Sequence, residues 1–234
     1  MLLSSSLITN DLTPDNPVDP TLALSLQNTL NQSSQGVVGS AAAITAATGS
    51  WFGASGVENL VTGVAVEPGD RFQIGSITKP FVATVALQLA EEGTLTLEDT
   101  LDRWLSADLI RQIPNAAQIT LRQLLNHTSG IPDHVPSLLS LGVNLFREWQ
   151  PTELIGLLAG AEAKFTPGTD WFYSNTNYVL MGLVVEAATQ SPIAQQIRSR
   201  ILEPLKLENT FLQEQKLFPA AQSAAIGMLM MMED

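Results

Sequence analysis

The chain has 234 residues, a formal net charge of -12 and a pI near 4.4, and its 11 lysines and arginines are scattered. Nucleic acid is not an expected partner, because phosphate binding needs clustered cations. No membrane span or secretory signal is expected, since the apolar stretches stop short of roughly 18 residues and the start lacks a basic segment and a sustained apolar core. Cysteine is absent, which excludes a disulfide framework and leaves the redox state of the compartment open.

The first part of the chain predicts a leader, a helix and strands, in that order. Residues 1–20 interleave prolines with asparagines and aspartates, which is typical of a mobile leader. A first helix is expected over Thr21–Gln32. Val37–Ala46 and Gly49–Val57 predict two strands around a tight turn, and Val61–Ile74 leads from them to the next motif.

A serine and a lysine three residues apart, Ser76 and Lys79, begin an apolar helical pattern that Gly93 ends. On a helix such residues share a face, about 5 to 6 Å apart at Cβ, so the amine can take the proton of the hydroxyl. The plainer alternative is that Ser76 caps the helix and Lys79 is solvated, although a cation is unfavourable at a helix N-terminus. From Ser76 to about Leu212 the pattern is mostly helical.

A second segment places Tyr173 and Asn175 between a Pro167-Gly168 turn and another apolar helix. Taken alone, Tyr173 could be an ordinary half-buried aromatic residue and Asn175 a helix N-cap.

The two histidines of the chain are not expected to carry chemistry. His127 closes a short helix at Leu121–Asn126, where a cation meets the negative helix end, so we expect a structural role. His127 and His134, without any cysteine, make a poor metal site and do not support a Ser-His-Asp triad. No metal and no cofactor are therefore expected.

Three ordered segments carry a resemblance to a known family. They are RFQIGSITK at 71–79, LLNHTSGI at 124–131 and PGTDWFYSNTNY at 167–178. Together they resemble the SxxK serine hydrolases that include class C β-lactamases, D-alanyl-D-alanine carboxypeptidases and related esterases. The similarity runs from about Gly36 to about Phe211. It implies an α+β, β-lactamase/transpeptidase-like fold, in which helices flank an antiparallel sheet and a large all-helical lobe is inserted between the sheet halves.

The resemblance also implies a role for each matching residue. Ser76 matches the nucleophile that is acylated, and Lys79 matches the amine beside it. Tyr173 matches the phenol that helps to deprotonate the serine and to protonate the leaving group, and Asn175 matches a contact to the substrate amide. Which of Lys79 and Tyr173 takes the serine proton stays open.

The later part of the chain departs from the family pattern. The family has a third motif on a late strand, Lys or His followed by Thr or Ser and then Gly, which lines the site opposite the serine. No such tripeptide follows Tyr173. The family's later strands would follow the point that matches Phe211, so the sheet is expected to be incomplete. In acyl-transfer enzymes the loss of one oxyanion donor lowers the rate by about 10²- to 10³-fold.

We therefore expect a mobile leader at 1–20 and a β-lactamase-like domain at 21–234. Within that domain, 21–75 holds the N-terminal helix and strands, 76–213 the helical lobe with the motifs, and 214–234 a truncated tail. An incomplete sheet exposes apolar surface, which predicts dye binding and self-association.

The expected function is that of a serine hydrolase that forms an acyl-enzyme at Ser76. Its expected substrates are D-alanyl-D-alanine-type peptides, β-lactams or esters, and the resemblance implies a periplasmic or extracellular location. The alternative is a non-catalytic remnant or binding module of the same fold, which the missing third motif favours.

Overall fold

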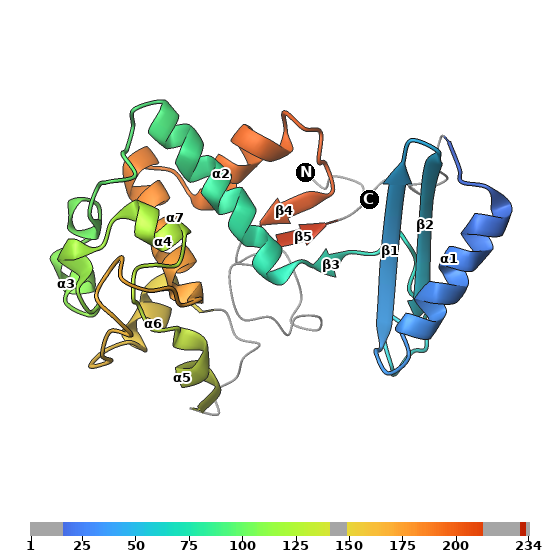
Figure 1. Cartoon of the computed structure of the whole chain (residues 1–234), viewed down its shortest axis with the longest axis horizontal. Coiled ribbons are helices and arrows are strands. Elements are labelled where there is room, and N and C mark those ends of the chain that lie inside the picture. Colours follow the sequence, from blue (N-terminus) through green and yellow to red (C-terminus); the bar gives the residue numbers. More distant parts are fainter. Residues whose placement is uncertain (1–15, 141–148, 213–229, 233–234) are drawn as a thin grey trace, which may run out of the picture. The chain divides into compact units, whose positions relative to one another are not determined.

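Residues 16–140, 149–212 and 230–232 are described by the computed structural model of the chain. These residues form two compact units, which divide between Phe72 and Gln73 (Figure 1). Each unit has its own secondary structure and is described separately below.

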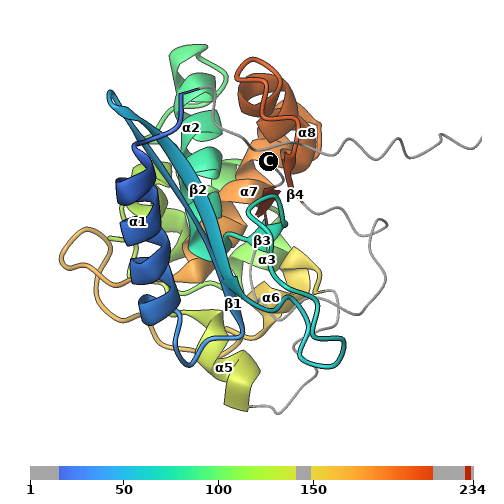
Figure 2. The ribbon, with the colours of Figure 1, turned by 90° about the vertical axis from the view of Figure 1, so that its right-hand side faces the viewer.

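The first unit is a helix packed on a two-stranded hairpin. Helix α1 (Pro20–Ser33) begins with Pro at its first position and with the Asp19 carboxylate accepting backbone N–H groups, two features typical of a helix start. Strands β1 (Gly39–Ala46) and β2 (Gly49–Gly56) pair antiparallel over their full lengths. Helix α1 lies along this hairpin and contacts β2 (Figures 1 and 2).

The described chain starts inside the predicted leader. The Ser50 N–H donates to Asn16 O at 2.7 Å, and the Val18 N–H donates to Ser50 O at 3.1 Å. Val18 is buried as well. The end of the predicted leader is therefore paired with the start of β2, whereas residues 1–15 lie outside the described residues.

The second unit is built around helices α2 (Thr78–Glu91) and α7 (Asn175–Thr189), which contact each other. The buried positions of α2 recur at helical spacing, as the sequence predicts, and helices α4 (Leu121–Leu125) and α8 (Ile193–Ile197) also pack on this pair. The core that results includes Val82, Val85, Leu89, Leu121, Leu124, Leu180, Val184 and Ile197. Burial of these side chains holds the two long helices in place.

Shorter elements connect the main helices of the second unit. They are the 3-10 turns η1 (Gly75–Ile77), η2 (Leu101–Arg103) and η3 (Ala116–Gln118), the helices α3 (Ala107–Ile110), α5 (His134–Ser140) and α6 (Pro151–Gly156), and the π-helical turn η4 (Arg198–Leu202). Among the described residues, every helix is too short or too polar to span a bilayer.

A small sheet has the strand order β3-β5-β4. Its strands are β3 (Phe72–Gln73), β4 (Thr210–Leu212) and β5 (Met230–Met232), and β4 and β5 pair antiparallel. The predicted tail at 214–234 falls mostly outside the described residues. Strand β5 is the part of that tail that the structure describes.

Candidate active site

Ser76 lies in the short turn that leads into helix α2. This turn is η1, and α2 follows it at Thr78. Gly75 has a φ of +53°, in the left-handed region that favours glycine, and it redirects the chain directly before the serine. Ser76 is exposed. The structure thus places the serine at the entrance to a buried helix and leaves it accessible to a substrate.

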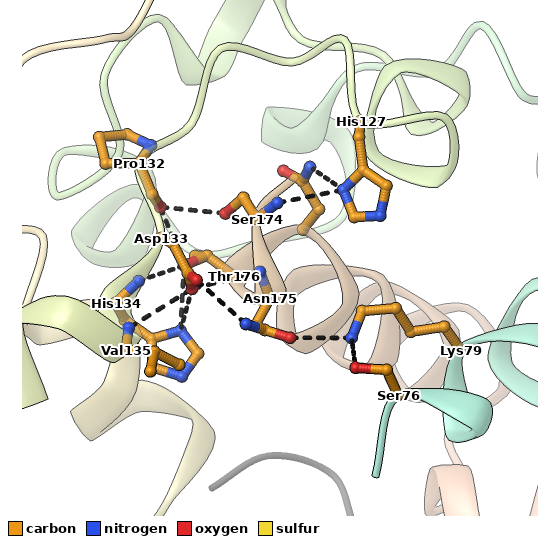
Figure 3. Close-up of polar contacts among 11 residues, drawn as sticks. Ser76, Lys79, His127, Pro132, Asp133, His134, Val135, Ser174, Asn175 and Thr176 are labelled. Carbon is orange, nitrogen blue, oxygen red and sulfur yellow. Dashed lines mark hydrogen bonds and ion pairs between the residues drawn. The ribbon is translucent and has the colours of Figure 1, made fainter. Parts of the chain in front are cut away.

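The amine of Lys79 reaches Ser76 from the first turn of α2. Lys79 Nζ donates to Ser76 Oγ at 3.1 Å and to Asn175 Oδ1 at 2.8 Å (Figure 3). The same nitrogen lies 4.9 Å from the centroid of the Tyr173 ring and 5.6 Å from that of Tyr178, within the range of cation–π attraction. These partners explain how a cation is held at a helix N-terminus, and they do not fit the alternative of a solvated lysine.

Asn175 comes to the serine from the start of the other long helix of the unit, and Tyr173 from the chain just before that helix. Tyr173 OH lies 2.7 Å from Ser76 Oγ, and either atom can donate the hydrogen bond. Asn175 is the first residue of α7, and Ser174 takes the N-cap position that the sequence alternative gave to Asn175. The structure therefore brings the four predicted site residues into one connected set of hydrogen bonds.

The LLNHTSGI segment supports the backbone that carries Tyr173. The Gly168 N–H donates to Thr128 O at 2.8 Å. The Phe172 N–H donates to His127 O at 3.0 Å. These two bonds hold the chain that leads into Tyr173, so they help to set where its phenol lies.

The His127 ring packs on Tyr173 and accepts hydrogen bonds. The two ring centroids are 4.6 Å apart, with 32° between the planes. His127 Nδ1 accepts the Ser174 N–H at 3.3 Å and lies 3.1 Å from Asn177 Nδ2. Burial, and then the nearby charge of Lys79, lower the pKa of His127. An imidazole that accepts at Nδ1 in this setting is neutral at pH 7.

This geometry corrects one detail of the prediction for His127. The residue does follow the C-terminus of helix α4, and its φ of +63° is a left-handed value often found after a helix end. The expected charge interaction with the helix end does not fit this geometry, because Nδ1 accepts the Ser174 N–H and so carries no proton of its own. The ring instead supports Tyr173 and the start of α7.

Asp133 is a residue of this site that sequence reasoning missed. Its Oδ1 accepts the backbone N–H of Asn175 at 3.2 Å, and its Oδ2 accepts from Asn175 Nδ2 at 3.0 Å (Figure 3). The carboxylate is mostly buried, with 15% of the side chain exposed. The available signal was its position directly after the segment 124–131 and Pro132.

His134 is buried and is paired with Thr176. Its backbone N–H donates to Thr176 Oγ1 at 3.1 Å, and its Nδ1 lies 3.0 Å from the same oxygen. Burial lowers the pKa of His134, although Asp133 acts in the opposite direction. No group of three or more His, Cys, Asp or Glu side chains that could hold a metal ion occurs in the part of the chain that the structure describes.

The arrangement contains the groups that covalent catalysis uses. A hydroxyl within hydrogen-bond reach of an amine and a phenol can lose its proton to one of them and attack a carbonyl carbon. The other group can then donate a proton to the leaving atom. Both distances, 3.1 Å from Lys79 Nζ and 2.7 Å from Tyr173 OH, are in that range.

The fold and this site agree with one family of proteins. The Beta-lactamase family model matches residues 18–230, so the chain belongs to this family. Solved structures with the same fold show that the predicted β-lactamase/transpeptidase-like class is correct.

Two curated relatives have the following similarity to the chain. Penicillin-binding protein 4* of Bacillus subtilis (strain 168) is 33% identical over 156 residues, which are 63% of this chain and 32% of that protein. Protein flp of Staphylococcus aureus (strain MW2) is 32% identical over 155 residues, 66% of this chain and 30% of that protein. The chain thus spans about a third of the length of these relatives.

Solved structures match a larger share of the chain. A D-stereospecific amidohydrolase from Streptomyces sp. has a TM-score of 0.73 and 34% identity, covering 86% of this chain and 60% of that one. The D-amino acid amidase from Ochrobactrum anthropi SV3, complexed with L-phenylalanine amide, has a TM-score of 0.72 and 29% identity, covering 85% and 54%. An octameric penicillin-binding protein homologue from Pyrococcus abyssi has a TM-score of 0.67 and 27% identity, covering 85% and 46%.

Proposed function

We propose that the chain is a serine hydrolase that forms an acyl-enzyme at Ser76. One observation carries this proposal: Ser76 Oγ lies 3.1 Å from Lys79 Nζ and 2.7 Å from Tyr173 OH. The serine is also exposed, so that a substrate carbonyl can approach it. Membership of the Beta-lactamase family supports the same reaction class.

The proposed reaction has two stages. In the first, Ser76 Oγ bonds to the carbonyl carbon while its proton passes to Lys79 or Tyr173, and the leaving nitrogen or oxygen departs with a proton from the same pair. In the second, water attacks the acyl carbon and gives a proton to this pair, and the bond from that carbon to Ser76 Oγ breaks as the pair returns a proton to Oγ. The two candidate bases lie at similar distances from Oγ, and the proposal holds with either.

The proposed substrates are D-alanyl-D-alanine-type peptides, β-lactams or esters. The solved relatives include enzymes named for D-stereospecific amide hydrolysis, and a curated relative is named for penicillin binding. All of these compounds offer a carbonyl carbon with a leaving nitrogen or oxygen. The family therefore supports acyl transfer, and the substrate among these three classes has to be identified by experiment.

A second candidate is a non-catalytic binding module of the same fold. It is favoured by the sequence after Tyr173, which contains no Lys or His followed by Thr or Ser and Gly. A site without the donors on that strand could still bind a ligand but would stabilise an oxyanion poorly.

Intact-protein mass spectrometry after incubation with a labelled penicillin or a fluorophosphonate tests both candidates. We expect one covalent addition to the folded protein and none to S76A, which differs from it by a single oxygen. No addition to folded protein would reject the acyl-enzyme. Saturable penicillin binding of equal affinity in the parent and S76A, without mass addition, would favour the binding module.

Two further expectations stay proposals. Self-association is proposed because an apolar group in the first unit is exposed, with Val61 94% and Leu60 76% accessible, and an octameric relative fits it. Sedimentation velocity tests it, and a monomer at all concentrations would contradict it.

A periplasmic or extracellular location is proposed from the family, and fractionation of expressing cells tests it.

A further inference from the structure

The Asp133 carboxylate contacts Asn175 at two points at once. Oδ2 accepts from the side-chain Nδ2 at 3.0 Å, and Oδ1 accepts from the backbone N–H at 3.2 Å (Figure 3). Oδ1 also accepts the Val135 N–H at 3.4 Å, which ties the carboxylate to the first turn of α5. The side chain of Asp133 is therefore fixed between the N-termini of α5 and α7.

These contacts determine which way the Asn175 amide points. An asparagine side chain has a donor end and an acceptor end of nearly equal shape, whereas an ionised carboxylate can only accept. With Asp133 on one side, the NH2 group must face the carboxylate and Oδ1 must face Lys79. The structure agrees with this orientation, since Lys79 Nζ donates to Asn175 Oδ1 at 2.8 Å.

We propose that Asp133 is a positioning residue that sets the Asn175 amide so that its oxygen, and not its NH2 group, holds the Lys79 amine against Ser76. This inference rests on the proposed acyl transfer at Ser76 for its kinetic consequence, but its geometric content is independent of activity. The connected order is carboxylate, amide, amine and serine hydroxyl, with Tyr173 on the far side of the serine.

The negative charge of Asp133 has a second effect at the same place. It lies at the N-terminus of α7, where backbone N–H groups are unpaired and the helix dipole favours an anion. A neutral amide at position 133 keeps the shape but loses this charge and gains a donor.

The variant D133N is expected to reverse the orientation of the Asn175 amide. The side-chain oxygen of the new asparagine still accepts hydrogen bonds from the backbone N–H groups of Asn175 and Val135. Its NH2 group therefore faces the NH2 group of Asn175. Two donors repel, and the Asn175 amide turns over. The NH2 group then faces the Lys79 amine, which loses its oxygen acceptor.

The reciprocal variant N175D places two carboxylates against each other. In the double variant D133N/N175D, the new amide donates to the new carboxylate, and the other carboxylate oxygen faces Lys79. The pair of changes therefore restores an oxygen acceptor for the amine, while the negative charge moves from position 133 to position 175. A role limited to general packing would not produce this reciprocal rescue.

Second-order rates of Ser76 labelling by the fluorophosphonate, followed by intact mass, test the proposal. We expect D133N and N175D each to slow labelling by about 10²-fold, the lower end of what a positioned acid or base contributes, and the double variant to recover to within about tenfold of the parent. Labelling of D133N at the parent rate, or no recovery in the double variant, would overturn it.

The matched control is D99N. The Asp99 side chain is also mostly buried, with 5% exposed, and it accepts the Thr96 N–H at 3.0 Å and a bond from Trp104 at 3.2 Å. It bonds to none of the four site residues. We expect D99N to unfold at a lower temperature yet to label at the parent rate, which separates lost stability from lost positioning.

A measurement without catalysis separates this inference from the proposed function. In nuclear Overhauser spectra of the protein, the Asn175 NH2 protons should contact the Asp133 β protons, and in D133N they should contact the Lys79 ε protons. Contacts to Lys79 in the parent protein would overturn the inference. If the parent shows the expected contacts but is never labelled, the acyl-transfer function fails while the positioning by Asp133 stands.

Discussion

Two tyrosines lie beside the Lys79 amine, and their hydroxyl groups make different contacts. Tyr173 OH lies 2.7 Å from Ser76 Oγ, whereas Tyr178 OH donates to Leu125 O at 3.0 Å. Burial, together with the neighbouring Tyr173, raises the pKa of Tyr178, so it remains a protonated donor. These are the two tyrosines of the chain, and they form a matched pair for separating chemistry from packing.

We predict that Y173F slows labelling of Ser76 by about 10²- to 10⁴-fold, because it removes the phenol hydroxyl and keeps the ring on His127. Labelling rates followed by intact mass provide the measurement. The unfolding temperature should change little, since Tyr173 is an exposed residue.

The control is Y178F, which removes a hydrogen bond from a half-buried hydroxyl. Its unfolding free energy should fall by about 1 kcal/mol, while labelling stays near the parent rate. The opposite pattern, with Y178F slow and Y173F fast, would show that the phenol of Tyr173 is not used.

The loop at 127–130 holds the segment that presents Tyr173. Gly130 has a φ of +74°, and a Cβ built on it would lie 2.3 Å from Phe165 O. Two segments distant in sequence thus approach each other at a position that only glycine suits. The close approach is stabilised by the Lys164 N–H, which donates to Gly130 O at 2.9 Å.

We predict that G130A destabilises the protein by clearly more than about 1 kcal/mol, because it combines an unfavourable φ with a backbone clash. Urea unfolding measures this. The matched control is G160A, where φ is +79° but no atom lies within 4 Å of the added Cβ, so only the conformational cost remains. Equal losses in the two variants would contradict the importance of the contact with Phe165.

Both histidines are buried in the folded protein, and their pKa values are lowered, chiefly by burial. In the unfolded chain a histidine has a pKa of about 6.5. Between the lowered folded value and about 6.5, the unfolded chain therefore binds more protons than the folded one, and acid favours unfolding.

We predict that the free energy of unfolding rises with pH up to about 6.5 and becomes flat above it, with a slope of at most about 1.4 kcal/mol per pH unit for each histidine. Urea unfolding between about pH 5.5 and 8 measures the slope, in a window above the titration of most carboxylates. H127Q and H134Q should each reduce the slope. An unchanged slope in both would assign the pH dependence to other groups.

Much of the second unit was predictable from the sequence. The apolar spacing of Val82, Val85 and Leu89 predicted α2 because a helix repeats every 3.6 residues, and the three-residue spacing of Ser76 and Lys79 predicted their contact. The uncharged state of His127 was not predictable, since it depends on burial and on the Lys79 charge, which the fold brings near. Asp133 was missed because its contacts with Asn175 also form only in the folded chain.

The family, the helical pattern and the pairing of Ser76 with Lys79 could be inferred before the fold was known, because each depends on residues close together in the chain. Two long-range contacts required the folded chain: Tyr173 lies 2.7 Å from Ser76 across 97 positions, and Asp133 bonds to Asn175 across 42. Such contacts depend on how α2, α7 and the loop at 127–133 pack, and packing is set by the whole buried core rather than by any local spacing.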